Sequence, residues 1–273
     1  MKYLLLPIII INIVFYSHAQ IGRLATLRVA TYTIESQPGL DKNPCSHENG
    51  DRFYQMLSQY TTQYYPGSYV FRDIYRQQSA VTRAALMSGE SQNCDFVYFN
   101  NHGNVNLIST WDDWYVYLND LLFTGNTKWV YINACNVLLS PGLYLPALFR
   151  NGIHAVFGYK SDSKWLENKY RCGFLWTTWC YDCRDRYMYD TYFNEWVVNG
   201  KTNWDAYSKA AYRQYQETGY AHEIAAYGSD VTVNGVRIYG IDEKYLQVYS
   251  GKMNASWSIG RSTIQPGGGT PIY

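Results

Sequence analysis

The stretch DFVYFNNHGN, residues Asp95–Asn104, decides the fold and carries the first candidate for chemistry. The run Phe96–Phe99 is aromatic or β-branched throughout, which is typical of a strand covered on both faces of a sheet. The run ends in polar residues, and His102 is followed at once by Gly103. We therefore expect a central strand whose carboxyl end carries an imidazole.

Similar strands alternate with helical patterns along the chain. Strands are expected at LATLRVATYTI from Leu24, KWVYINAC from Lys128 and IHAVFGY from Ile153, and helices at HENGDRFYQMLSQYTTQYY from His47, SAVTRAALMSG, LYLPALFRNG and NWDAYSKAAYRQY. VTVNGVRIYG predicts a hairpin, because Asn-Gly suits a tight turn. This alternation predicts an α/β protein with a mostly parallel central sheet and helices on both faces. Ligands of such sheets bind beyond the carboxyl ends of the strands.

The first residues have the pattern of a secretion signal. Lys2 precedes an apolar stretch, and Ser17-His18-Ala19 matches the small-x-small pattern that signal peptidase cleaves. The apolar stretch is shorter than the about 20 residues that span a bilayer, which disfavours the alternative of an uncleaved anchor. We expect a signal peptide over 1–19 that is cut after Ala19, an α/β domain over 20–260 and a flexible Gly/Pro tail over 261–273. The mature protein is then secreted, without stable insertion into a membrane.

The charge balance excludes some partners. The chain has 23 Lys and Arg against 22 Asp and Glu, a formal net charge of +1. Nucleic acids and anionic lipids attract proteins with a basic excess, so neither is an expected partner. Aromatic residues make up 18% of the chain. They fit ordinary packing, and they also fit an aromatic surface that binds a protein or a glycan.

A second reactive side chain, Cys135, follows the next predicted strand. Because neighbouring parallel strands end at one edge, we expect Cys135 and His102 to lie side by side. A neutral imidazole can take a proton near pH 7, and a thiol beside it can ionise below its free pKa of about 8.5. Gly103 permits close approach to the backbone, whose N–H can bind a developing oxyanion. A cysteine, a histidine and such an amide are the minimum for acyl transfer.

FVYFNNHG and WVYINAC resemble the His-Gly and Ala-Cys motifs of clan CD cysteine peptidases, the group of caspases, legumains and gingipains. NGIHAVFGY is similar to the segment that follows the cysteine in these enzymes, and the resemblance covers roughly residues 24–160. It implies a caspase-like three-layer sandwich and an endopeptidase that acts on peptides or proteins with neither a cofactor nor a metal. It also implies Cys135 as the nucleophile, His102 as its catalytic partner, and an oxyanion hole made by Gly103 and the Cys135 amide.

The motifs also depart from these families. Asn133-Ala134-Cys135-Asn136 replaces the Gln-Ala-Cys of caspases and the acidic residue that legumains carry two positions before the cysteine. The step from His102 to Cys135 is 33 residues (135 − 102), against roughly 50 in caspases. These differences concern substrate preference more than fold, and they also fit a branch of the clan that has lost activity.

Acidic residues near this edge are candidates for binding a basic substrate side chain. Asp112 and Asp113 lie in TWDDWYVYLND, and Asp162 lies in GYKSDS. A carboxylate pairs well with a basic group in a partly desolvated cleft. Helix capping by Asp112 or Asp113 is the alternative.

The cysteine count argues against a nucleophile. Six cysteines in a secreted protein favour three disulfides, so a thiol at Cys135 requires a second cysteine that is unpaired or pairs between chains. Cys180–Cys183 (CYDC) lacks the second pair that a zinc site needs, so local disulfides are expected in this apparently helical stretch. Two functions follow: a secreted cysteine peptidase, or a non-catalytic binding protein of the same fold with Cys135 in a disulfide.

Overall fold

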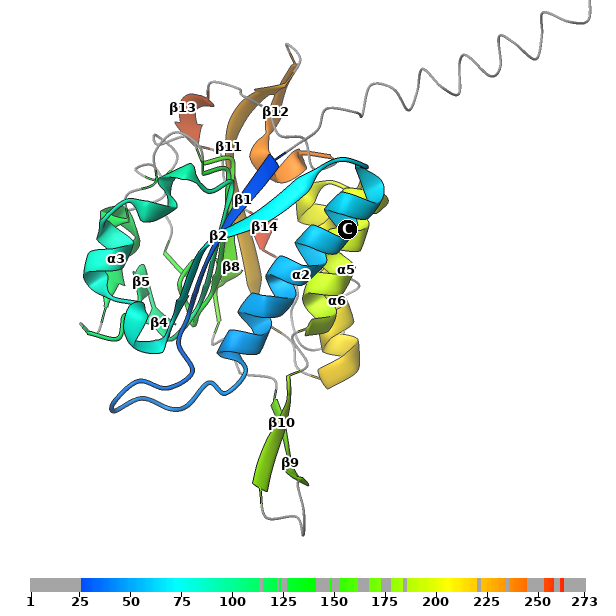
Figure 1. The fold of residues 1–273 in the computed structure, drawn as a ribbon. Helices are drawn as coiled ribbons and strands as arrows, with labels where there is room; N and C mark the ends of the chain where they lie inside the picture. Colours follow the sequence, from blue (N-terminus) through cyan, green and yellow to red (C-terminus); the bar gives the residue numbers. More distant parts are fainter. Residues whose placement is uncertain are drawn as a thin grey trace, which may run out of the picture.

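A computed structural model of the chain describes residues 26–112, 115–121, 123, 127–140, 148, 153–161, 167–172, 178–183, 186–219, 222–233, 236–244, 253–257 and 261–262. Its centre is a twisted sheet with the strand order β12-β11-β8-β7-β3-β1-β2 (Figure 1). The strands are β1 (Thr26–Thr33), β2 (Tyr69–Gln77), β3 (Phe96–Asn100), β7 (Trp129–Asn133), β8 (Ala155–Tyr159), β11 (Ile224–Val233) and β12 (Val236–Tyr239). The five strands from β2 to β8 are parallel, and β11 and β12 are antiparallel. The short strands β13 (Met253–Trp257) and β14 (Arg261–Ser262) pair with β11.

The central strands are buried on both faces. Every residue of β3, β7 and β8 is buried, as expected of strands with continuous apolar runs. On one face lie α2 (Ser46–Tyr64), α5 (Arg186–Phe193), which continues into a π-helical turn, and α6 (Asn203–Thr218) (Figure 1). The short helix α3 (Arg83–Met87) lies on the other face. This is the layered α/β arrangement predicted for a caspase-like sandwich.

Aromatic rings fill the core between the sheet and the three helices. Phe53 of α2 stacks on Tyr98 of β3 with ring centroids 4.6 Å apart, and it meets Phe193 at 5.1 Å. Burial of one such ring contributes about 1.5–3 kcal/mol. This core therefore accounts for a substantial share of the aromatic residues of the chain.

Smaller elements extend from the main sheet. β4 (Gly103–Asn104), β5 (Leu107–Ile108) and β6 (Val116–Tyr117) form a three-stranded sheet, and β9 (Glu167–Cys172) pairs with β10 (Thr178–Cys183) in a hairpin. Short 3₁₀ turns occur at Gln78–Ala80, Glu90–Asn93, Leu118–Asp120 and Gly240–Asp242. The predicted hairpin from Val231 is confirmed by the pairing of β11 with β12.

Two expectations for the region around Cys180 are wrong. Thr178–Cys183 is a strand rather than part of a helix, because its residues pair with β9, and the helix begins only at Arg186. Cys183 is not in a local disulfide, since it is bonded to Cys45. The predicted signal over 1–19, most of the predicted helix LYLPALFRNG and residues 263–273 of the predicted tail lie outside the described residues. In the described ranges, no helix combines the length and apolar character needed to cross a membrane.

Candidate functional site

The register between β3 and β7 sets the positions of His102 and Cys135. Asn100, the last residue of β3, lies opposite Asn133, the last residue of β7. His102 and Cys135 each come two residues after this pair. Because the two strands are parallel neighbours, both residues leave the sheet at the same edge, as expected.

Gly103 packs directly against the cysteine turn. A Cβ atom added to Gly103 would lie 2.7 Å from the Cβ of Ala134, 2.9 Å from the carbonyl oxygen of Leu107 and 3.4 Å from that of Cys135. The backbone of the His-Gly segment is therefore in contact with the Ala-Cys segment. A side chain at position 103 would push the two segments apart.

Replacing Gly103 with alanine tests this contact. The added methyl group has to displace backbone atoms, and overpacking of this kind costs about 1–3 kcal/mol of unfolding free energy. We expect a lower urea midpoint and a changed alkylation rate of Cys135. Asn104→Ala is the matched control, because it adds no atom beside Ala134. If Gly103→Ala matches the wild type in both measurements, the two segments are not in tight contact.

The imidazole of His102 is oriented by a backbone carbonyl. Its Nε2 lies 2.6 Å from the carbonyl oxygen of Asp41, and the side chain is half-buried. A carbonyl oxygen only accepts hydrogen bonds, so Nε2 carries the hydrogen. In this tautomer the lone pair of the ring is on Nδ1.

Asp41 lies in the segment between β1 and α2, of which we call residues 35–45 the strap (Figure 1, blue loop at the lower left). The strap is held mainly by side-chain hydrogen bonds. Gln37 Nε2 donates to the carbonyl of Thr110 at 2.7 Å, and Asn43 Nδ2 donates to Asn100 Oδ1 at 2.9 Å. Sequence reasoning missed the strap, because any residue can supply a carbonyl and the segment ESQPGLDKNPC has no hydrophobic period.

The cysteines divide into thiols and a disulfide. Cys135 is a half-buried thiol, Cys94 is a fully buried thiol, and Cys45 is bonded to Cys183. The expectation of three disulfides is therefore wrong. The binding-protein hypothesis placed Cys135 in a disulfide, and that part of it is wrong as well. Cys94 is the second thiol that the count required. The side chains of Cys172 and Cys180 are not among those that the structure describes.

Alkylation is expected to distinguish Cys135 from Cys94. Burial, with the nearby carboxylates of Asp73 and Asp95, raises the pKa of Cys94 to about 12. At pH 8 only about one Cys94 in 10⁴ is then a thiolate, the form that reacts. We expect iodoacetamide to label Cys135 in the native protein and to label Cys94 only after denaturation, as read by peptide mass spectrometry. Equal native labelling of both thiols would contradict this assignment.

The three acidic candidates have different outcomes. Asp112 Oδ1 accepts a hydrogen bond of 2.7 Å from the backbone N–H of Arg83, the first residue of α3. Asp112 thus binds the first turn of α3, but the N-cap of this helix is Thr82, so the capping of a helix by Asp112 and its role in substrate binding both stay predictions. Asp113 and Asp162 lie outside the described residues. Over the described part of the chain, no group of three or more His, Cys, Asp or Glu residues is placed to hold a metal ion.

Comparison with known proteins places few limits on function. No family model and no curated protein matches the chain. Solved structures do match, among them the crystal structure of the Arg-specific cysteine proteinase gingipain R, at 13% identity and a TM-score of 0.42. That match covers 70% of this chain and 42% of the proteinase, so the chain spans less than half of its length. A likeness at this level carries no functional argument, and the function has to be argued from the site.

Proposed function

We propose that the protein is a secreted cysteine peptidase that hydrolyses peptide bonds with Cys135 and His102. The observation that carries the proposal is the packing of Gly103 against Ala134 and Cys135, which sets the histidine and cysteine segments side by side beyond β3 and β7. The resemblance of both segments to the clan CD motifs supports the same conclusion. The Cys45–Cys183 disulfide supports secretion, since disulfides persist in oxidising compartments.

The proposed reaction proceeds through a thioester. The Cys135 thiolate attacks the peptide carbonyl, and the C–N bond breaks as the His102 imidazolium gives its proton to the leaving amine. His102 then takes a proton from water, whose oxygen attacks the thioester and releases the acid and the thiol. The backbone N–H groups of Gly103 and Cys135 bind the oxyanion in both steps. The Asp41 carbonyl holds the imidazole through Nε2, so Nδ1 is the nitrogen proposed to exchange the proton.

Cleavage of a mixed peptide library by the wild type and by Cys135→Ala tests the proposal. We expect new termini only with the wild type, and their sequences then report the residue preferred before the cleaved bond. Equal inertness of both proteins across a wide pH range would contradict peptidase activity.

A binding protein is the second candidate, and exposed rings favour it. Tyr69 and Phe71 of β2, the edge strand of the main sheet, are 61% and 50% exposed and stack with ring centroids 6.3 Å apart. Exposed aromatic pairs are common in protein and glycan interfaces. This candidate predicts a bound ligand that is lost in a Tyr69→Ala/Phe71→Ala variant and kept in Cys135→Ala.

A further inference from the structure

We propose that the Cys45–Cys183 disulfide positions the catalytic histidine and makes the site sensitive to reduction. By holding the strap it keeps the Asp41 carbonyl against His102, so that reduction lowers turnover while the sheet stays folded. This inference rests on the proposed function and adds a mode of regulation to it.

The disulfide joins two segments that meet at the carboxyl end of the sheet. Cys45 is the last residue of the strap and the N-cap of α2, and Cys183 is the last residue of β10, 138 positions later. The hairpin of β9 and β10 projects from the same end of the molecule as the strap (Figure 1). Asp41 lies four residues before Cys45. The covalent bond therefore fixes the end of the strap that lies next to the carbonyl bound by His102.

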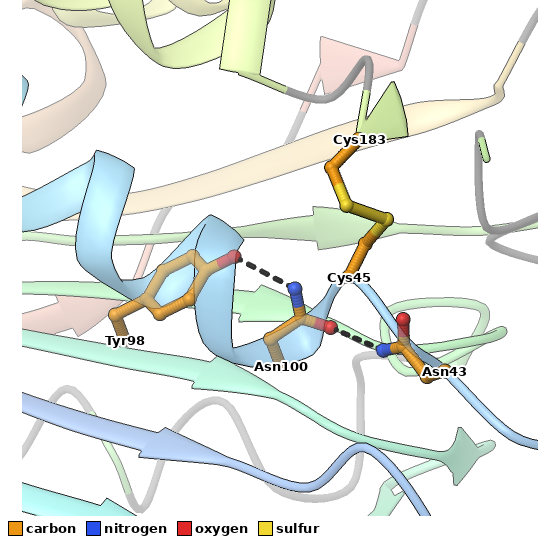
Figure 2. The surroundings of a disulfide bond; sticks show 5 residues. All are labelled: Asn43, Cys45, Tyr98, Asn100 and Cys183. Carbon is orange, nitrogen blue, oxygen red and sulfur yellow. Dashed lines mark hydrogen bonds between the residues drawn. A yellow bond between two sulfur atoms is a disulfide. The ribbon is translucent and has the colours of Figure 1, made fainter. Parts of the chain in front are cut away.

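The hydrogen bonds of this part of the strap continue into the core. Figure 2 shows Asn43 bonded to Asn100, whose Nδ2 donates to the hydroxyl of Tyr98 at 3.0 Å. The hydroxyl of Ser46 donates to the carbonyl of Asn100. The disulfide lies directly beside this chain of contacts, between Asn43 and the start of α2 (Figure 2). The strap thus has one covalent anchor and a few polar ones.

The polar anchors are incomplete. Gln37 Oε1 and Asn43 Oδ1 are buried, and neither has a hydrogen-bond partner within the part of the chain that the structure describes. Unsatisfied buried acceptors lower the stability of the contacts that bury them. Segments held mainly by such contacts are the first to open locally. The start of the strap is also held by the side chain of Gln78, which bonds Glu35 and Ser36. The disulfide is therefore expected to be the dominant constraint on the other end of the strap, the end that carries Asp41.

The redox step is an ordinary dithiol exchange. A dithiol reductant supplies two electrons and two protons, the bond between the Cys45 and Cys183 sulfurs breaks, both become thiols, and the dithiol becomes a disulfide. Cys135 must be a thiol in the same molecule. Turnover should therefore rise at low reductant, as oxidised Cys135 recovers, and fall once the buried disulfide is reduced.

The first experiment compares dithiothreitol-titrated wild type with a Cys45→Ala/Cys183→Ala variant. A misplacement of about 1 Å in a catalytic group can cost 100-fold. We expect kcat to fall about 10- to 100-fold on reduction and in the double variant, with KM changed less than about twofold. Asn43→Ala, with the disulfide intact, should shift kcat in the same direction by less. Glu243→Gln is the control. Glu243 contacts Trp129 and His154 at the amino ends of β7 and β8, away from the candidate site, so this variant should leave kcat unchanged.

The second experiment needs no activity. In ¹⁵N-histidine-labelled protein, the Nε2–H of His102 bound to a carbonyl should give a slowly exchanging proton signal, which should disappear on reduction and in the double variant. If this signal disappears on reduction but the wild type cleaves no peptide, the peptidase proposal fails and the positioning of His102 by the disulfide stands. If the signal and kcat are the same with and without the disulfide, the positioning role is overturned. Should the double variant fail to fold, Asn43→Ala and stepwise reduction monitored by circular dichroism decide.

Discussion

Cys135→Ala is expected to lower kcat toward a susceptible peptide by about 10⁶-fold, because loss of an activated nucleophile removes the covalent route altogether. Binding contacts and oxyanion donors remain, so a small rate above that in water is expected to persist. KM should change little, since the sulfur contributes mainly to the transition state. The measurement is single-turnover cleavage of a peptide chosen from the library.

Two further variants show whether the loss is specific to the proposed mechanism. His102→Ala should lower kcat by about 10²–10⁴-fold, the usual contribution of general acid–base catalysis. Combining it with Cys135→Ala should add almost nothing, because the two groups act as a unit. Cys94→Ala removes a buried thiol that has no proposed role in the reaction, and it should retain kcat. A Cys135→Ala protein that cleaves as fast as the wild type would overturn the mechanism.

Glu243→Ala is expected to give the largest loss of stability, about 3–5 kcal/mol of unfolding free energy. The Glu243 side chain is 3% exposed. It accepts 2.8 Å hydrogen bonds from the Trp129 indole and the His154 imidazole. Its backbone carbonyl accepts from the indole of Trp196 and from the N–H of Asn203. Alanine would leave the donors of Trp129 and His154 buried and unsatisfied, beside a cavity.

Urea denaturation measures this loss, and an unchanged slope would show that the same cooperative transition is being compared. Glu243→Gln should lose less, about 1–3 kcal/mol, because the amide can still accept one of the two side-chain hydrogen bonds. Glu217→Ala breaks a surface pair with Arg213 on α6 and should cost about 0.3–0.5 kcal/mol. If Glu243→Ala resembled Glu217→Ala, this buried cluster would not stabilise the fold.

The central strands that sequence analysis predicted differ physically from β2, one of the strands it missed. β3, β7 and β8 are buried along their whole length, so their apolar runs are continuous and easily read. β2, with the sequence YVFRDIYRQ, was not predicted. It is the edge strand, paired only with β1 in the described sheet, and most of its residues are exposed or half-buried. An exposed strand can contain arginine and aspartate, and these residues interrupt the apolar run by which a strand is recognised.

The candidate site, like the strands, was predictable only in part. His102 and Cys135 follow two continuous apolar runs, and the parallel register of β3 and β7 brings their segments together. The carbonyl that orients His102 comes from a residue 61 positions earlier, and Glu243 meets His154 across 89 positions. No pattern among neighbouring residues predicts either contact.

The sequence by itself determined the buried strands, the helices α2 and α6, and the placement of a histidine and a cysteine at one edge, since burial and strand direction follow from nearby residues. Only the tertiary structure decided that Cys45 pairs with Cys183, that Cys94 and Cys135 stay thiols, and that the strap contacts His102. Disulfide pairing depends on which segments pack side by side in the folded chain, and cysteine spacing does not specify that.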